Sequence, residues 1–283
     1  QRQMFIRDRA RGGRVAPSRY LDFLKAYAEE DVFLPVMGIA GNLHLMYLVT
    51  TGATRDRTAE IGICFLESVL EKIGYDPKDG EANTTRMLRD AILYRGVMFG
   101  SEAAKTWGEA AFLKLLEGRR IHPDIQRSAL QIGAWCSPDR ALDFFRNRLA
   151  TSDSEHERMN VLMAMGCLSD EAVMRDALAH ALDNVPQRNR HIPMVSCSAN
   201  PLAMPFLWDF FTSNLTKLET LHPILFERVI DAMVPLCGLD RETAVNDFFS
   251  EYLSGKKTCA ATIRIALEFL EVNAKMRRRA GEG

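Results

Sequence analysis

Residues 198–214 read SANPLAMPFLWDFFTSN, and this stretch contains the clearest structural signal in the chain of 283 residues. A polar loop that ends in Asn200-Pro201 leads into a segment with four aromatic residues, Phe206, Trp208, Phe210 and Phe211. The side chain of an Asn before a helix can accept a backbone N–H that has no partner within the helix. We therefore predict a helix over 202–214. Its aromatic side chains should pack between helix layers, and burial should contribute about 1.5–3 kcal/mol for each of them.

The helical period extends outward from this stretch over nearly the whole chain. Val245, Phe248, Phe249 and Tyr252 fall at spacings of three, four and seven residues, which is the pattern of one buried helix face. No run of alternating Val, Ile and Thr indicates a strand, so we predict an all-α chain. The expected helices are 18–29, 32–50, 56–73, 84–99, 101–117, 123–135, 137–150, 155–166, 169–182, 187–197, 202–214, 218–235, 241–253 and 257–276.

Start and stop signals separate these helices by short links. Ser137, Ser169 and Asp240 each stand before an acidic first turn, as helix-capping residues do. Glycines at positions 74, 100, 118 and 255 mark helix ends. Short links place successive helices antiparallel, which favours an irregular HEAT- or armadillo-like α-α superhelix of stacked antiparallel helix pairs. A compact helical bundle is the alternative that the spacing leaves open.

Composition excludes several classes of protein. With 47% hydrophobic residues the chain can bury a large core, and its net charge of −1 indicates no general attraction to nucleic acid or acidic lipid. The longest uncharged apolar stretch, residues 32–49, is interrupted by Pro35, Asn42 and His44, and is too polar to span a membrane. No secretion signal follows the N-terminus, and a chain that starts at Gln suggests a fragment.

Six cysteines occur singly, and no pair of them forms a CxxC motif. Most of them lie within apolar helical patterns, as Cys64 does in Ile61-Gly62-Ile63-Cys64-Phe65. Free Cys is among the most buried residue types, so we expect reduced thiols in the core and neither a zinc site nor a disulfide framework. Reduced thiols favour a reducing compartment, and we expect the protein in the cytoplasm.

Arginines gather at both ends of the chain, in residues 1–14 and in 277–279. Basic ends can bind nucleic acid, which would make the chain a nucleic-acid-binding helical repeat. Solvated, disordered ends are the more common outcome. We therefore expect a disordered segment over 1–13, a disordered basic tail over 277–283 and no nucleic-acid partner.

No residue pattern supplies chemistry within the chain, and we assign no catalytic residue. The only His-Glu pair, His156-Glu157, has no second His one helical turn later, so the zinc motif HExxH is missing. No GxSxG or phosphate-binding glycine loop is present, and no two of the six His have the i, i+4 spacing of a helical zinc site. We therefore expect neither a metal nor any other cofactor bound to this chain.

Several segments resemble, in order, the C-terminal domain of the M1 zinc aminopeptidases of the puromycin-sensitive and aminopeptidase N type. Residues 198–214 are the most specific, since those enzymes also have an Asn-Pro loop that opens a helix with a Trp and Phe. Residues 18–24 resemble the first helix of that domain, 85–89 (Thr-Arg-Met-Leu-Arg) its R-x-L-R helix, and 245–253 its late helix. The likeness covers residues 14–276.

The resemblance implies a fold and a role. In that family the domain is a bowl-like α-superhelix that closes over the zinc-bearing domain and limits which peptides enter the chamber. By position, Tyr47 matches a Tyr that lines a basic pocket for the carboxyl end of the peptide. The next position, a Lys in those enzymes, is Leu48 here, and a position that supplies an Arg is Gly166. Both cations of the pocket are thus missing at the matching positions.

The sequence therefore predicts a non-catalytic C-terminal domain, over residues 14–276, of an M1 zinc aminopeptidase. Its expected partners are the catalytic domain of the same parent chain, where zinc would be bound, and the peptide substrate; no membrane partner is expected. The alternative is a free-standing HEAT-like scaffold that binds another protein. For Arg86 and Arg89 the residues leave two interpretations open, a place in the interior channel or ion pairs with acids of a neighbouring helix. We expect structural ion pairs.

Overall fold

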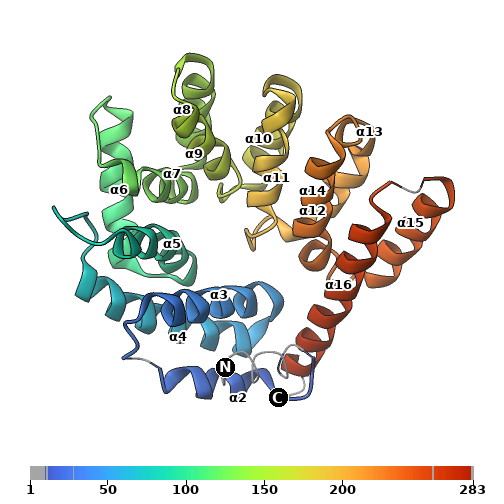
Figure 1. Ribbon diagram of the computed structural model, residues 1–283, viewed down its shortest axis with the longest axis horizontal. Coiled ribbons are helices and arrows are strands. Elements are labelled where there is room, and N and C mark those ends of the chain that lie inside the picture. The colour runs from blue at the N-terminus through green and yellow to red at the C-terminus, as the bar shows by residue number, and fades with distance from the viewer. Residues whose placement is uncertain (1–9, 11, 28, 257, 282–283) are drawn as a thin grey trace. The chain divides into compact units, whose positions relative to one another are not determined.

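The computed structural model describes residues 10, 12–27, 29–256 and 258–281. Within these residues it contains fifteen α-helices, one short 3-10 helix and no strand (Figure 1). The predicted all-α fold is confirmed. The chain divides into two compact units: unit 1 is residues 1–136 and 276–283, and unit 2 is residues 137–275.

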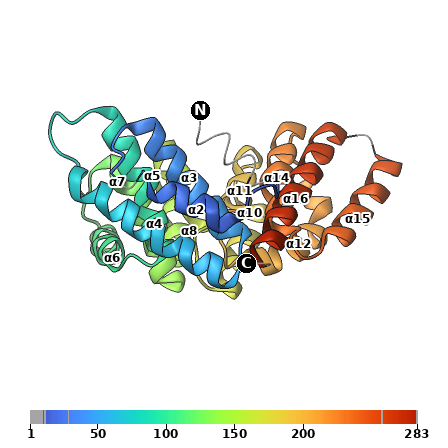
Figure 2. The same ribbon diagram turned by 90° about the horizontal axis from the view of Figure 1, so that it is seen from below.

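Unit 1 is built from helices that pack on their neighbours in the chain. Its helices are α2 (Pro17–Lys25), α3 (Phe33–Val49), α4 (Gly52–Ile73), α5 (Asn83–Phe99), α6 (Glu102–Leu116) and α7 (Pro123–Cys136). α3, α5 and α7 form one row, α4 and α6 pack against this row, and α2 lies against α4 (Figure 2). α3 carries no charged residue, as suits a helix held between α4 and α5.

Unit 2 repeats the same arrangement. Its helices are α8 (Pro138–Thr151), α9 (Glu155–Met165), α10 (Glu171–Asn184), the 3-10 helix η1 (Gln187–Asn189), α11 (His191–Cys197), α12 (Met204–Ser213), α13 (Leu215–Leu218), α14 (Pro223–Cys237), α15 (Glu242–Gly255) and most of α16 (Ala260–Gly281). α9, α11 and α14 form a row, onto which α8, α10 and α12 pack. A row of alternate helices with their partners on one side is typical of stacked helix pairs.

Most expected helix bounds agree with the structure to within a few residues, and the largest differences have local causes. The helix expected over 18–29 ends at Lys25, because the chain turns at Ala26 and Tyr27. The helix expected from residue 218 starts at Pro223, since the N–H that Pro lacks is not needed in a first turn. Its expected first residue belongs to α13, a separate short helix.

The C-terminal tail differs from the sequence prediction. Residues 277–281, expected to be disordered, continue α16 to Gly281, because Met276 and Ala280 are buried one turn apart. Thr54 at the start of α4 donates a hydrogen bond of 3.3 Å to the carbonyl of Ala280. Residues 282–283 and most of the expected N-terminal disordered segment lie outside the described residues.

Helix ends follow the predicted signals only in part. Ser137 precedes α8 without a side-chain hydrogen bond to it, and the cap of α10 is Asp170, one residue after the expected Ser169, whose side chain accepts the N–H of Val173 at 3.0 Å. α15 begins after Arg241 and not after Asp240, which takes a positive φ of 66°. Gly100 closes α5 with a φ of 108°, a backbone conformation that favours glycine. Asn200 accepts the N–H of Leu202 at 3.0 Å in the turn that precedes α12.

Asn200 also ties two helix pairs of unit 2 together. Its buried side-chain amide donates to the carbonyls of Gly166 (3.1 Å) and Leu168 (2.7 Å), which follow α9. Carbonyls after a helix end lack partners within the helix, so this amide satisfies groups that would otherwise be buried alone. The Asn of the loop over 198–201 therefore has a structural role that extends beyond the start of its own helix.

The cysteines only partly match the core prediction. All six are free; Cys167, Cys197, Cys237 and Cys259 are buried, and Cys136 is half-buried. Burial raises the pKa of the Cys136 thiol to about 12, which keeps it protonated and unreactive at neutral pH. Cys64 was expected in the core but lies on the exposed face of α4, because its neighbours Gly62 and Phe65 occupy the buried face.

Candidate functional site

Tyr47 lies near the end of α3, at the turn where the chain reverses into α4. Its ring is half-buried and meets the Phe99 ring of α5 edge to face, with centroids 5.3 Å apart. The guanidinium of Arg55 lies over the Tyr47 ring, with its central carbon 4.3 Å from the ring centroid. A cation over an aromatic face is attracted by the negative charge of the ring face. Tyr47 is therefore an aromatic residue with a bound cation.

Sequence reasoning missed Arg55. The residue that directly follows Tyr47 is Leu48, which is buried in the core of unit 1 and carries no charge. The cation comes instead from the first turns of α4, because the short link between the two antiparallel helices brings residue 55 back to residue 47. No carboxylate among the described residues forms an ion pair with Arg55. The short link between the two helices is the sequence signal that could have predicted Arg55 near Tyr47.

Gly166, which matches the position of the pocket Arg in the family, has no space for a side chain. A Cβ added there would lie 2.5 Å from the backbone nitrogen of Cys197 and 2.5 Å from the Cβ of Ser196. The close approach of α9 to α11 depends on this glycine. An Arg at this position would require the two helices to separate.

We expect Gly166→Ala to destabilise unit 2, since the new methyl group would overlap backbone that cannot give way. Overpacking of this kind costs about 1–3 kcal/mol in the free energy of unfolding. Gly41→Ala is the matched control, because it lies inside α3 with nothing within 4 Å of an added Cβ. The control should be neutral or stabilising by up to about 1 kcal/mol. Urea denaturation followed by circular dichroism compares them, and equal midpoints would contradict the packing argument.

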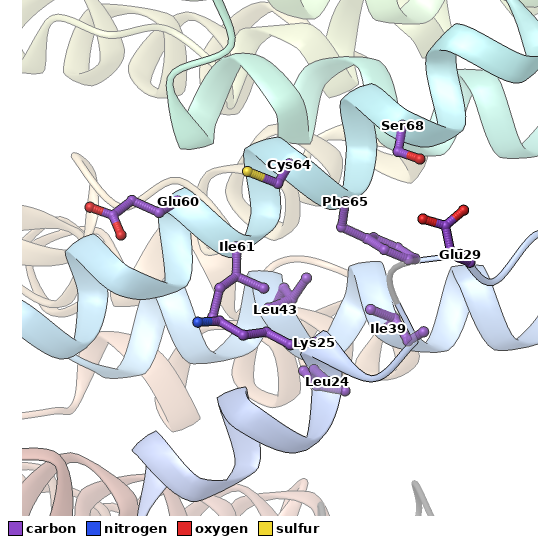
Figure 3. A pocket seen from close by; sticks show the side chains of 10 residues that line it. All are labelled: Leu24, Lys25, Glu29, Ile39, Leu43, Glu60, Ile61, Cys64, Phe65 and Ser68. Carbon is purple, nitrogen blue, oxygen red and sulfur yellow. The ribbon is translucent and has the colours of Figure 1, made fainter.

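A cavity of about 470 Å³ lies between α2, α3 and α4 (Figure 3). Its floor is apolar, and Glu60 and Glu29 lie near its two ends in the close-up. Close to it along the chain, Val32 and Leu34 at the start of α3 are 58% and 75% exposed. Large apolar side chains at this exposure favour contact with another protein surface. The remaining lining residues are Leu24, Lys25, Ile39, Leu43, Ile61, Cys64, Phe65 and Ser68.

The His156-Glu157 pair belongs to the framework of unit 2. The Glu157 carboxylate accepts two hydrogen bonds from Arg148, at 2.7 and 2.6 Å, and one from Ser152. The Arg148 bonds hold the pKa of Glu157 below its usual range. Within the part of the chain that the structure describes, no group of three or more His, Cys, Asp or Glu could hold a metal ion. None of the helices described there is long and apolar enough to cross a membrane.

The chain matches a known family of protein domains over most of its length. Residues 6–271 match the family described as ERAP1-like C-terminal domain, so the match begins earlier than the boundary at residue 14 expected from motifs. The chain belongs to this family, whose domain forms the C-terminal part of M1 aminopeptidases.

Plant aminopeptidases are among the relatives. The chain is 25% identical over 254 residues to Aminopeptidase M1-D of Oryza sativa subsp. japonica, which covers 84% of the chain and 28% of the relative. It is 24% identical over 216 residues to Aminopeptidase M1 of Arabidopsis thaliana, with 72% of the chain and 24% of the relative covered. The chain thus spans about a quarter of the length of these relatives.

Proposed function

We propose that this chain is the non-catalytic domain that closes the peptide chamber of an M1 zinc aminopeptidase and shapes access to it. The observation that carries the proposal is the match of residues 6–271 to the ERAP1-like C-terminal domain. The zinc would be held by the catalytic domain of the parent protein, since the sequence of this chain lacks the HExxH motif. Six free cysteines favour a reducing compartment, and a cytoplasmic location is part of the proposal.

The surface proposed to dock on the catalytic domain is at the start of unit 1. Val32 and Leu34 expose apolar side chains there, and the cavity of α2, α3 and α4 has an apolar floor. Burial of apolar area is the main favourable term when two domains associate. Met87 and Ile224 lie singly on other helices, as is normal for a protein surface, whereas Ile265 and Phe269 are exposed one turn apart on α16.

Tyr47 and Arg55 are proposed to contact the peptide, with Arg55 as the cation for its terminal carboxylate. Leu48 and Gly166 supply no charge, whereas Arg55 lies over the Tyr47 ring and has no carboxylate partner among the described residues. A guanidinium binds a carboxylate through charge-assisted hydrogen bonds. The hydroxyl of a half-exposed Tyr47 can donate a further hydrogen bond.

The test compares Arg55→Gln with Arg57→Gln in the protein translated from the complete reading frame. Arg57 is the matched control, because it lies two residues further on and pairs with Asp22. We expect Arg55→Gln to raise KM by about tenfold for a peptide with a free carboxyl end, since one charge-assisted bond is lost. Hydrolysis of the same peptide as its C-terminal amide should be unchanged. An equal effect on acid and amide would contradict the assignment of Arg55.

A second experiment tests whether this chain breaks peptide bonds unaided. The isolated chain is incubated with added zinc and aminoacyl chromogenic substrates, and we expect no saturable hydrolysis. Saturable zinc binding together with peptidase activity would contradict a non-catalytic role. If the complete reading frame encodes no HExxH and the chain captures a defined protein partner, the scaffold alternative replaces the proposal.

A further inference from the structure

A second cavity, of about 420 Å³, lies within unit 2 and has no part in the proposed function. It is formed where the ends of α8 and α10 approach the start of α9 and the segment 185–189. Small-molecule sites commonly have volumes of about 300–1,000 Å³. Gly166, which matches the position of the pocket Arg in the family, lies at the opposite end of α9, so this cavity is at a different place.

Three arginines line the cavity, and their charges are only partly balanced. Arg146 pairs with Asp176 at 2.6 Å, while Arg158 and Arg188 share the single carboxylate of Glu155, at 2.8 and 3.5 Å. Three guanidinium groups therefore face two carboxylates, which leaves one positive charge without a counterpart. The side chain of Asn189 also donates to Glu155, so this carboxylate is shared among three donors.

Free donors remain at the cavity. The Nε of Arg146 is buried and has no hydrogen-bond partner in the described part of the chain. Arg188 is held at 3.5 Å from Glu155, and its side chain is 72% exposed, so most of its N–H groups are free. That buried atom is out of reach of a ligand, so the donors that a ligand can reach are terminal N–H groups of Arg188 and of Arg146, whose side chain is 35% exposed. The donors point to a ligand that supplies oxygen acceptors.

The other lining residues are mostly apolar: Leu149, Ala150, Leu162, Val185 and Pro186. An inorganic anion alone would leave this part of the cavity without contacts. His180 adds no charge at neutral pH, because burial and the nearby Arg146 lower its pKa. Asp183, whose charge acts to raise the pKa of His180, forms an ion pair with Lys217 at 2.7 Å, so its charge is balanced.

We propose that this cavity binds a small organic monocarboxylate, with its carboxylate on Arg146 and Arg188 and its apolar body against Leu149, Leu162 and Val185. One unbalanced positive charge matches one carboxylate better than a phosphate dianion. Arginine binds the planar carboxylate group through parallel hydrogen bonds. The inference rests on the cavity alone and holds whether or not the chain closes an aminopeptidase chamber.

The probe is phenylacetate, titrated into the 283-residue chain and followed by saturation-transfer NMR of the ligand. We expect saturable binding to the unaltered chain and none to phenylacetamide, which has the same shape without the charge. Arg188→Gln should weaken binding by about tenfold, since it removes charge-assisted hydrogen bonds. Arg119→Gln is the matched control, because Arg119 is exposed, pairs with the exposed Glu117 and lies in unit 1.

Glu155→Gln is expected to raise the affinity for phenylacetate, a result that a misfolded variant would not give. It removes the carboxylate that competes for Arg158 and Arg188, so phenylacetate should bind more tightly than to the unaltered chain. The proposal is overturned by equal binding of phenylacetamide, by unchanged binding to Arg188→Gln, or by weaker binding to Glu155→Gln. Preferential binding of phenyl phosphate would also overturn it, as it would show a site for a doubly charged group.

Discussion

Replacing Arg89 by Met should lower the free energy of unfolding of unit 1 by about 3–5 kcal/mol, the usual cost of breaking a buried ion pair. The Arg89 side chain is 0% exposed and makes two 2.6 Å hydrogen bonds to the Glu81 carboxylate. It also donates to the carbonyls of Gly74 (2.8 Å) and Ile73 (3.0 Å) at the end of α4. Met fills similar space but would leave one buried carboxylate and two carbonyls without these donors.

Arg86→Met is the control for this substitution. Arg86 lies on the same helix, its side chain is 35% exposed, and it approaches Glu81 and Asp124 only to 3.9 and 3.5 Å. Partly exposed pairs contribute about 1 kcal/mol or less, so the control should lose little stability. Urea denaturation followed by circular dichroism measures both variants. Equal losses for the two would contradict the role assigned to the buried pair.

The same ion pair gives an expected pH dependence. The hydrogen bonds from Arg89 lower the pKa of Glu81 below its ordinary value of 4.5. A lowered folded-state pKa stabilises the folded state fully above the unfolded pKa, and this stabilisation is lost as pH falls through the folded pKa. The difference in stability between the unaltered chain and Glu81→Gln should therefore shrink as the pH falls below about 4.5.

Trp208→Ala should destabilise unit 2 by about 3–5 kcal/mol, since it removes the centre of an aromatic cluster. The Trp208 ring stacks on Phe211 at 5.7 Å and meets Phe248 and Phe249 edge to face at 5.3 and 5.9 Å. α12 and α15 are held together through these rings. Aromatic pairs add about 0.5–1.5 kcal/mol each beyond the area that they bury.

Trp107→Ala is the control for Trp208→Ala, because it makes the same substitution at a half-buried position of unit 1. Trp107 contacts the Tyr75 ring at 6.1 Å and donates to Asp76 at 3.2 Å, both in an exposed loop. We expect a loss of about 1 kcal/mol, as for most single substitutions outside a packed core. Circular dichroism is the suitable probe, because Trp208→Ala removes the Trp of unit 2. A loss no larger than that of the control would contradict the structural role of Trp208.

The helical period in the sequence was enough to predict the fold class and most of the helices. Phe248 and Phe249 could be assigned to a buried face because helix periodicity depends on residues that are near in the chain. The end of α16 could not be predicted, because its order depends on the burial of Ala280 and on its contact with Thr54, 226 residues away. Local sequence carries no record of such a contact.

The candidate sites depend on contacts between elements, which sequence alone placed less well. Tyr47 was selected by position, but its cation, Arg55, follows from the geometry of the turn between α3 and α4. The arginines of the cavity in unit 2 belong to α8, α9 and η1, and each resembles an ordinary surface residue in the sequence. Their shared Glu155 and the buried Nε of Arg146 are visible only in three dimensions.

The most direct test measures how substrate length affects hydrolysis when this chain is removed. The protein from the complete reading frame is compared with a version that stops before Arg14, using aminoacyl-aminomethylcoumarin and a series of longer peptides. We predict that the shorter protein retains zinc-dependent hydrolysis of the small substrate and loses discrimination among peptides by length. Unchanged length preference without this chain, in an enzyme that remains active, would contradict the account.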